Sequence, residues 1–223
     1  MFSEAQGTDL LRPFVYLPEW TRLENSSNPS RGAAFLDRDD TIIVDVVHLS
    51  DASDIELLPE SIPGIRLLQE RLFIIIITNQ SVIARGLVDE QGLVEIHRTL
   101  TTMLYAEGVT VDAVYSCPHH PTAGNLPYRM KCDCRKPEPG MILQAKRDFD
   151  QIQLAESIVI GNDMTDVLAG QRAGVPTTAL LCDNRADLSV SSKGRPTYIA
   201  SSIYEVAKRV VQPGRGGNRS CLG

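Results

Sequence analysis

Short apolar runs alternate along this chain with longer segments whose apolar residues recur at helical spacing. The runs have the length of buried strands and comprise residues 33–36, 73–78, 113–116, 157–160 and 177–181. Segments with helical spacing comprise residues 62–71, 89–107, 140–148, 163–173 and 201–211. Strands that alternate with helices predict an α/β fold, in which a parallel sheet carries helices on both faces. Such a sheet binds ligands beyond the carboxyl ends of its strands, so the residues after each run are candidates for a site.

The length of 223 residues is enough for one sizeable core and favours a single domain. We expect this domain over residues 32–211, with a partly disordered N-terminal extension over 1–31 and a flexible Gly- and Arg-rich tail over 212–223. No apolar run is long enough to cross a bilayer and the first residues lack the layout of a signal peptide, so we expect no membrane partner and a cytoplasmic location. The net charge of −6 argues against nucleic acid as a partner.

The first candidate segment is acidic. Asp37, Asp39 and Asp40 directly follow the apolar run 33–36. An extended backbone points Asp37 and Asp39 in the same direction. Two carboxylates so close need a cation between them or a proton on one of them, which is what a metal-assisted nucleophile and acid require. An acidic loop or a helix cap is the alternative.

Small hydrogen-bonding side chains follow the most apolar run of the chain. Thr78, Asn79 and Gln80 are suited to hold the oxygens of a phosphate group, and Arg85 is suited to reach an anionic substrate. An ordinary polar turn and a solvated loop arginine are the alternatives.

Two further segments carry charge. Lys136 is suited to neutralise a transferring phosphoryl group and Arg135 to grip a second anionic group, unless they form an ordinary basic surface pair. Asn162, Asp163 and Asp166 follow another apolar run and offer oxygen ligands to a hard cation. Capping of the next helix is the competing role for Asn162 or Asp163.

Three of the five cysteines are clustered in the sequence. Cys117 and His119 form Cys-x-His, and Cys132 and Cys134 form Cys-x-Cys after a short loop. Three thiolates and an imidazole suit a tetrahedral Zn²⁺ with no open position, so we predict a structural zinc loop over residues 117–134. His120 is left to face substrate or solvent. Coincidental cysteines and a zinc ribbon that binds nucleic acid are the alternatives.

The four polar segments together resemble the four motifs of the haloacid dehalogenase superfamily of phosphohydrolases. The matches are Asp37-x-Asp39-x-Thr41 for the first motif, Thr78 for the second, Lys136 for the third and residues 161–166 for the fourth. The resemblance covers about residues 33–182 and implies a Rossmann-like sheet.

The resemblance also implies a role for each matched residue. Asp37 would be the nucleophile that forms an aspartyl-phosphate, and Asp39 would be the acid and base. Thr78 or Asn79, together with Lys136, would stabilise the transferring group. The implied cofactor is a catalytic Mg²⁺, with ligands from Asp37, Asp39, Asn162 and Asp163.

The zinc loop narrows the resemblance to the branch that holds heptose bisphosphate phosphatases and histidinol-phosphate phosphatases. Residues 78–86 and 117–121 are similar to the heptose members. This implies a small phosphorylated sugar as the partner, a heptose 1,7-bisphosphate that loses its 7-phosphate on the way to nucleotide-activated heptose for surface glycans. It also implies a monomer without a large cap domain. The implied substrate contacts are Asp45, Asn79, Gln80, Arg85 and Arg135.

Three residues depart from the pattern of the superfamily. Asp40 and Val82 stand where glycine is usual, so we expect extra charge beside the metal and a shifted or strained substrate loop. Asn162 stands where a metal-ligating aspartate is usual, which predicts weaker Mg²⁺ binding unless Asp163 or Asp166 replaces it. The alternatives are therefore a phosphatase for histidinol phosphate or another small phosphomonoester, or a catalytically impaired binding or interaction protein on the same fold.

Overall fold

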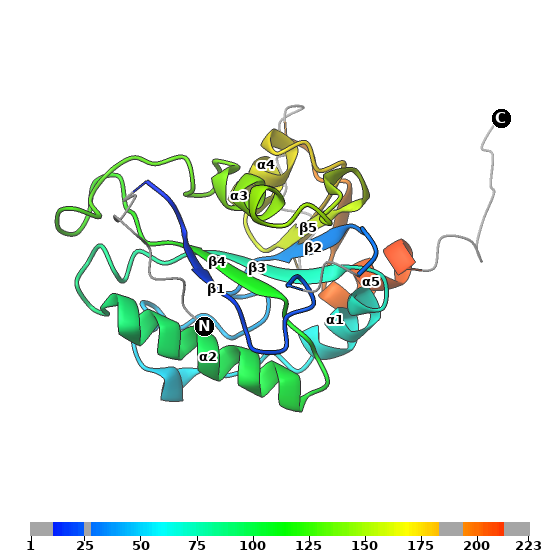
Figure 1. Ribbon diagram of the computed structural model, residues 1–223, viewed down its shortest axis with the longest axis horizontal. Helices are drawn as coiled ribbons and strands as arrows, with labels where there is room; N and C mark the ends of the chain where they lie inside the picture. Colours follow the sequence, from blue (N-terminus) through cyan, green and yellow to red (C-terminus); the bar gives the residue numbers. More distant parts are fainter. Residues whose placement is uncertain (1–10, 25–27, 183–193, 212–223) are drawn as a thin grey trace.

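A seven-stranded sheet forms the centre of the molecule (Figure 1). The structure, a computed structural model, describes residues 11–24, 28–182 and 194–211. Its strands are β1 (Phe14–Tyr16), β2 (Ala33–Leu36), β3 (Phe73–Asn79), β4 (Ala113–Cys117), β5 (Ile158–Gly161), β6 (Thr177–Leu181) and β7 (Tyr198–Ala200). Their order is β1-β4-β3-β2-β5-β6-β7, and all neighbours are parallel except β1 and β4.

Helices cover both faces of this sheet (Figure 1). One face carries α1 (Ser61–Gln69), α2 (Glu90–Ala106) and α5 (Ile203–Val211), and the other carries α3 (Gly140–Asp148) and α4 (Met164–Arg172). Two short 3-10 turns complete the list, η1 (Ala52–Asp54) and η2 (Leu154–Glu156). Successive side chains of β3 enter opposite cores, as Ile74 and Ile75 show. Because both faces are buried, the central strands are continuous apolar runs.

The predicted α/β fold is confirmed, with a largely parallel sheet and helices on both faces. The five predicted strands and five predicted helices are all present, and their bounds agree to within two residues. The segment between β2 and β3 contains only η1 and α1, so no cap domain is inserted there. No helix in the described part of the chain is long and apolar enough to cross a membrane.

Residues 11–24 are built into the domain, although their composition predicted that they belong to an extension over residues 1–31. β1 pairs antiparallel with β4, and Leu23 is buried in the core. The indole of Trp20 stacks on Tyr105 of α2, with ring centroids 4.4 Å apart. Local composition did not reveal β1, because this strand has only three residues and is held by contacts with residues far away in the sequence. Residues 1–10 and the predicted tail 212–223 lie outside the described residues.

Candidate active site

A buried lysine joins two carboxylates at the carboxyl end of the sheet. Asp37 directly follows β2, and its amide donates to the Ile160 carbonyl of β5 at 2.9 Å. The Lys136 ammonium lies 2.6 Å from Asp37 Oδ1 and 2.6 Å from Asp166 Oδ1. Its third partner is the carbonyl of Ile77, at 2.9 Å. The structure therefore brings the predicted nucleophile and the predicted phosphoryl-binding lysine into direct contact.

The charges of this cluster shift the pKa of its members. Burial raises the pKa of Asp37 to about 7; Lys136 opposes this shift, and Asp166 and Asp39 add to it. Burial favours a lower pKa for Lys136, but the Asp37 and Asp166 carboxylates hold that pKa above its usual value. Lys136 is therefore a cation, and Asp37 lies where one more positive charge would favour its ionised form.

Asp39 lies beside this cluster, and two buried side chains donate hydrogen bonds to its carboxylate. The buried Arg38 guanidinium donates through Nε to Asp39 Oδ1 at 2.9 Å. Gln80 Nε2 donates to Asp39 Oδ2 at 3.0 Å and to Thr78 Oγ1 at 2.7 Å. Gln80 therefore joins Thr78 to Asp39. This proximity is expected, because Asp39 follows β2 while Thr78 and Gln80 lie at the end of the neighbouring strand β3. Arg38 was not among the predicted site residues; its position between Asp37 and Asp39 was the only signal for it.

Asn79, a predicted substrate contact, bonds to the backbone of Lys136. Its Nδ2 donates to the Lys136 carbonyl at 3.2 Å, and its Oδ1 accepts from the Lys136 amide at 3.0 Å. The Asn79 side chain thus fastens the loop that carries Lys136 to the end of β3.

The fourth motif supplies three oxygen-bearing side chains with different surroundings. Asn162 is exposed at the end of β5 and lines a cleft together with Asp40. Asp163 caps α4 by accepting from the Thr165 amide at 2.7 Å. Asp166 is buried and accepts from the Asp163 amide at 3.1 Å, so it closes the capping box. Asp163 is thus occupied by the helix start, and Asp166 by the helix start and Lys136. Asn162 is the member of the three that lines the cleft.

The oxygen donors at this edge fit a hard cation such as Mg²⁺. Asp37 has a pKa raised by burial and by neighbouring carboxylates, which is the signature of a place that favours a positive charge. Asn162 follows β5, the strand beside Asp37, and offers a neutral oxygen at the same edge.

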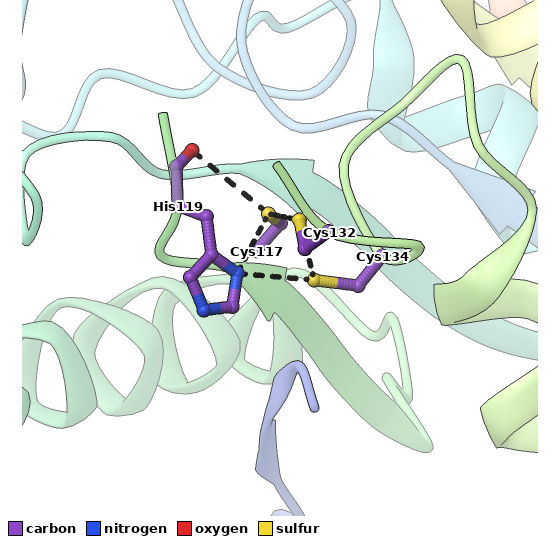
Figure 2. Close-up of side chains that lie close together, drawn as sticks. All are labelled: Cys117, His119, Cys132 and Cys134. Atoms are coloured by element: carbon purple, nitrogen blue, oxygen red, sulfur yellow. Dashed lines mark hydrogen bonds between the residues drawn. The ribbon is translucent and has the colours of Figure 1, made fainter. Parts of the chain in front are cut away.

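Four side chains from the predicted zinc loop converge (Figure 2). The ligand atoms of Cys117, His119, Cys132 and Cys134 all lie within 4.8 Å of one another. The Cys117 and Cys132 sulfurs are 3.6 Å apart, and His119 Nδ1 is 3.4 Å from the Cys134 sulfur. Ligands on a tetrahedron around Zn²⁺ would be about 3.5–3.8 Å apart, given bonds of about 2.0–2.3 Å.

The charge state of these thiols also fits a metal ion. Burial raises the pKa of Cys117 to about 12, so this sulfur would stay protonated without a cation beside it. His120 lies outside the cluster, because its Nδ1 accepts from the amides of Thr122 and Ala123 at 3.2 and 2.8 Å. The cluster can therefore hold a metal ion through three sulfurs and one imidazole.

The predicted substrate contacts fall in two places. Arg135 Nη1 donates to the His119 carbonyl at 3.1 Å. After burial, Arg135 and Arg85 are the causes that lower the pKa of His120, so the two arginines share one neighbourhood. Asp45 is largely exposed, and slight desolvation, followed by the charges of Asp39 and Asp40, raises its pKa. The arginines thus concentrate positive charge near the Cys/His cluster, whereas Asp45 lies on the acidic side.

Comparisons with known proteins agree with this geometry. A family model described as "HAD-hyrolase-like" matches residues 133–206. The D-glycero-beta-D-manno-heptose-1,7-bisphosphate 7-phosphatase of Escherichia coli K12 is 38% identical over 179 residues, which cover 80% of this chain and 93% of that protein. The protein of the same name from Photorhabdus laumondii is 33% identical over 179 residues, which cover 80% of this chain and 94% of that protein. The chain belongs to the haloacid dehalogenase-like phosphatases.

Solved structures place the chain in the same family. A putative HAD-like phosphatase from Mesorhizobium loti is 30% identical, covers 94% of this chain and 97% of its own, and superposes with a TM-score of 0.77. A D,D-heptose 1,7-bisphosphate phosphatase from B. bronchiseptica, complexed with magnesium and phosphate, is 31% identical with a TM-score of 0.69. That match covers 82% of this chain and 99% of the other. This haloacid dehalogenase-like phosphatase is therefore a phosphoric monoester hydrolase.

Two of the departures from the phosphatase pattern have different backbone consequences. Asp40 has a φ of 51°, in the left-handed region, and its Oδ1 accepts from the Asp45 amide at 3.1 Å. Aspartate is one of the few residue types that visit this region, so the missing glycine is tolerated. Val82 is buried and does not have a positive φ. The prediction of backbone strain at Val82 was wrong, because the loop does not require a positive φ at this residue.

Proposed function

We propose that this phosphatase removes the 7-phosphate of D-glycero-D-manno-heptose 1,7-bisphosphate by a magnesium-dependent reaction through an aspartyl-phosphate on Asp37. The observation that carries the mechanism is the contact between the Asp37 carboxylate and the buried Lys136 ammonium, with Asp39 next to them. The substrate rests on the named relatives, which match 80% of this chain.

The side chains divide the reaction into two steps. Asp37 Oδ attacks phosphorus in line, the bond from phosphorus to the sugar oxygen breaks, and Asp39 gives that oxygen a proton. Asp39 then takes a proton from a water molecule, whose oxygen attacks phosphorus and releases phosphate from Asp37. Lys136 neutralises charge on the transferring group, and Thr78 donates a hydrogen bond to it.

Metal ions have two separate roles in this proposal. Asp37, the Asp39 carbonyl and Asn162 would hold Mg²⁺, which would supply positive charge that favours the ionised nucleophile and shields the phosphoryl oxygens. The neutral Asn162 oxygen makes this site weaker than one with an aspartate there. Cys117, His119, Cys132 and Cys134 would hold a structural Zn²⁺, because four protein ligands would leave no open position on the ion.

We assign the rest of the substrate to the two arginines, Arg85 and Arg135, and to Asp45. Arg85 and Arg135 grip the 1-phosphate, because they bring two guanidinium groups to one place. Asp45 accepts from sugar hydroxyls near Asp39. The 1-phosphate would therefore meet the two arginines, and the 7-phosphate would meet Lys136 at the reacting end.

The test is phosphate release from heptose 1,7-bisphosphate over a Mg²⁺ titration, with histidinol phosphate alongside. We expect Mg²⁺-dependent release from the bisphosphate and a loss of at least about 10³-fold in kcat for Asp37→Asn. Asp54→Asn, on the exposed η1 turn, is the control for surface carboxylates. No release from either substrate at any Mg²⁺ concentration would refute the proposal, and full turnover by Asp37→Asn would remove Asp37 as the nucleophile.

A further inference from the structure

Arg38 is buried to a degree that is unusual for an arginine. It is 1% exposed and lies directly between Asp37 and Asp39 in the sequence. A guanidinium is costly to remove from water unless a carboxylate and hydrogen bonds compensate it. The partner that compensates Arg38 is the side chain of Asp39.

The contact between these two residues involves both carboxylate oxygens. Asp39 Oδ1 is 2.9 Å from Arg38 Nε and 2.8 Å from Arg38 Nη2. Asp39 Oδ2 is 3.1 Å from Arg38 Nη2 and 3.0 Å from Gln80 Nε2. Gln80 is itself buried and tied to Thr78, so it cannot swing away freely. Donors from the interior thus hold both oxygens, while the Asp39 side chain stays 27% exposed.

The loop does not need this side-chain contact to keep its shape. The Arg38 backbone carbonyl accepts from the amides of Ile42 and Ile43 at 2.8 and 3.1 Å. An isolated bridge between Asp39 and Ile43 closes the same turn. Backbone bonds therefore already fix the turn after β2. The Arg38 side chain is not needed for that turn, and its contact with Asp39 instead orients the Asp39 carboxylate.

We propose that Arg38, supported by Gln80, is the positioning residue for the acid and base of the reaction, Asp39; this inference rests on the proposed function. Without a donor on each oxygen, the Asp39 carboxylate is free to rotate about its side-chain bonds. A rotated carboxylate neither delivers the proton to the sugar oxygen nor accepts one from water. Arg38 acts through Asp39 and does not itself touch the reacting atoms.

The first test compares Arg38→Met with wild type on two substrates. We expect kcat for heptose 1,7-bisphosphate to fall about 10²-fold with KM changed less than about threefold, because acid and base catalysis is lost while binding remains. With p-nitrophenyl phosphate, whose leaving group needs no proton, the variant should release one rapid equivalent of p-nitrophenolate and then turn over slowly. The burst would show that Asp37 still accepts the phosphoryl group while water is no longer activated.

Two milder variants keep the test valid if Arg38→Met does not fold. Arg38→Lys keeps the charge but not the planar pair of donors, and should recover part of the lost kcat. Gln80→Met keeps the volume and removes one donor, and should lower kcat about tenfold. The matched control is Arg22→Met, which breaks the ion pair of another arginine with a buried carboxylate, Asp112, and should leave kcat unchanged below its unfolding temperature.

The outcomes separate the two proposals. A wild type that releases no phosphate would overturn the proposed function, and this inference with it. An active wild type whose kcat stays within about threefold in Arg38→Lys and Gln80→Met would overturn the role of Arg38 alone. A rise in KM at unchanged kcat would also overturn it, because Arg38 would then act in substrate binding.

Discussion

The ion pair between Arg22 and Asp112 should stabilise the whole domain, because it ties the N-terminal segment to a buried carboxylate beside the central strand β3. The Asp112 side chain is fully buried and accepts from Arg22 Nε at 2.8 Å, from the Arg22 amide at 3.1 Å and from the Ile74 amide at 2.7 Å. Removing one partner of a buried ion pair costs about 3–5 kcal/mol, because a charge is left in the interior. The two amides remain and Arg22 is 24% exposed, so we expect Arg22→Met to lose about 3 kcal/mol of unfolding free energy.

The only tryptophan gives a direct assay for this loss. Trp20 fluorescence reports the stack on Tyr105, and far-ultraviolet circular dichroism reports the helices during urea unfolding. Both transitions should move together to lower urea, whereas Arg98→Met, which breaks an exposed pair with Glu95, should cost less than about 0.5 kcal/mol. An unfolding free energy of Arg22→Met that matches wild type, or a Trp20 transition well ahead of the helix transition, would refute this reasoning.

Three further perturbations test the metal sites and a buried histidine. Cys134→Ser should abolish bound zinc, measured by elemental analysis, and cost more than about 3 kcal/mol of stability; Cys182→Ser is the control, and retained zinc in Cys134→Ser would contradict the assignment. Asn162→Asp should lower the Mg²⁺ concentration for half-maximal activity about tenfold, and an unchanged titration would argue against Asn162 as a ligand. Burial, and then Arg38, lowers the pKa of His97 from 6.5 to about 3, so the unfolded state binds its proton first and stability is lost as pH falls below about 6.5. His97→Gln should remove about 1.4 kcal/mol per pH unit from this loss, measured as the difference in urea unfolding between pH 6.5 and pH 5; equal slopes in both proteins would contradict it.

Much of the fold could be predicted because the central strands are apolar on both faces. The run at residues 73–78 reads as a buried strand without any knowledge of its neighbours. β1 and β7 are three residues long and lie at the edges of the sheet, so they carry no such pattern. Arg22 and Asp112 are separated by 90 residues, and no local signal connects them.

The candidate site could be predicted in composition but not in its internal contacts. The order of polar residues after each strand indicated which side chains would meet, and Asp37 and Lys136 do meet. The sequence could not show that Asn79 is used by the Lys136 backbone, because that bond depends on how a loop lies against β3. Arg38 was missed for a similar reason, since a buried arginine and a surface arginine are identical in the sequence.

The shared lysine has a consequence for electroneutrality during turnover. Lys136 lies 2.6 Å from each of two carboxylates, Asp37 and Asp166. In the proposed reaction Asp37 gives up its negative charge each time it becomes an acyl phosphate, whereas Asp166 takes no part in bond making. The interior cation therefore keeps a permanent counter-ion while its other partner is consumed and regenerated. When Asp37 carries the phosphoryl group, Lys136 still has Asp166 as its partner, so the buried ammonium is never an isolated charge.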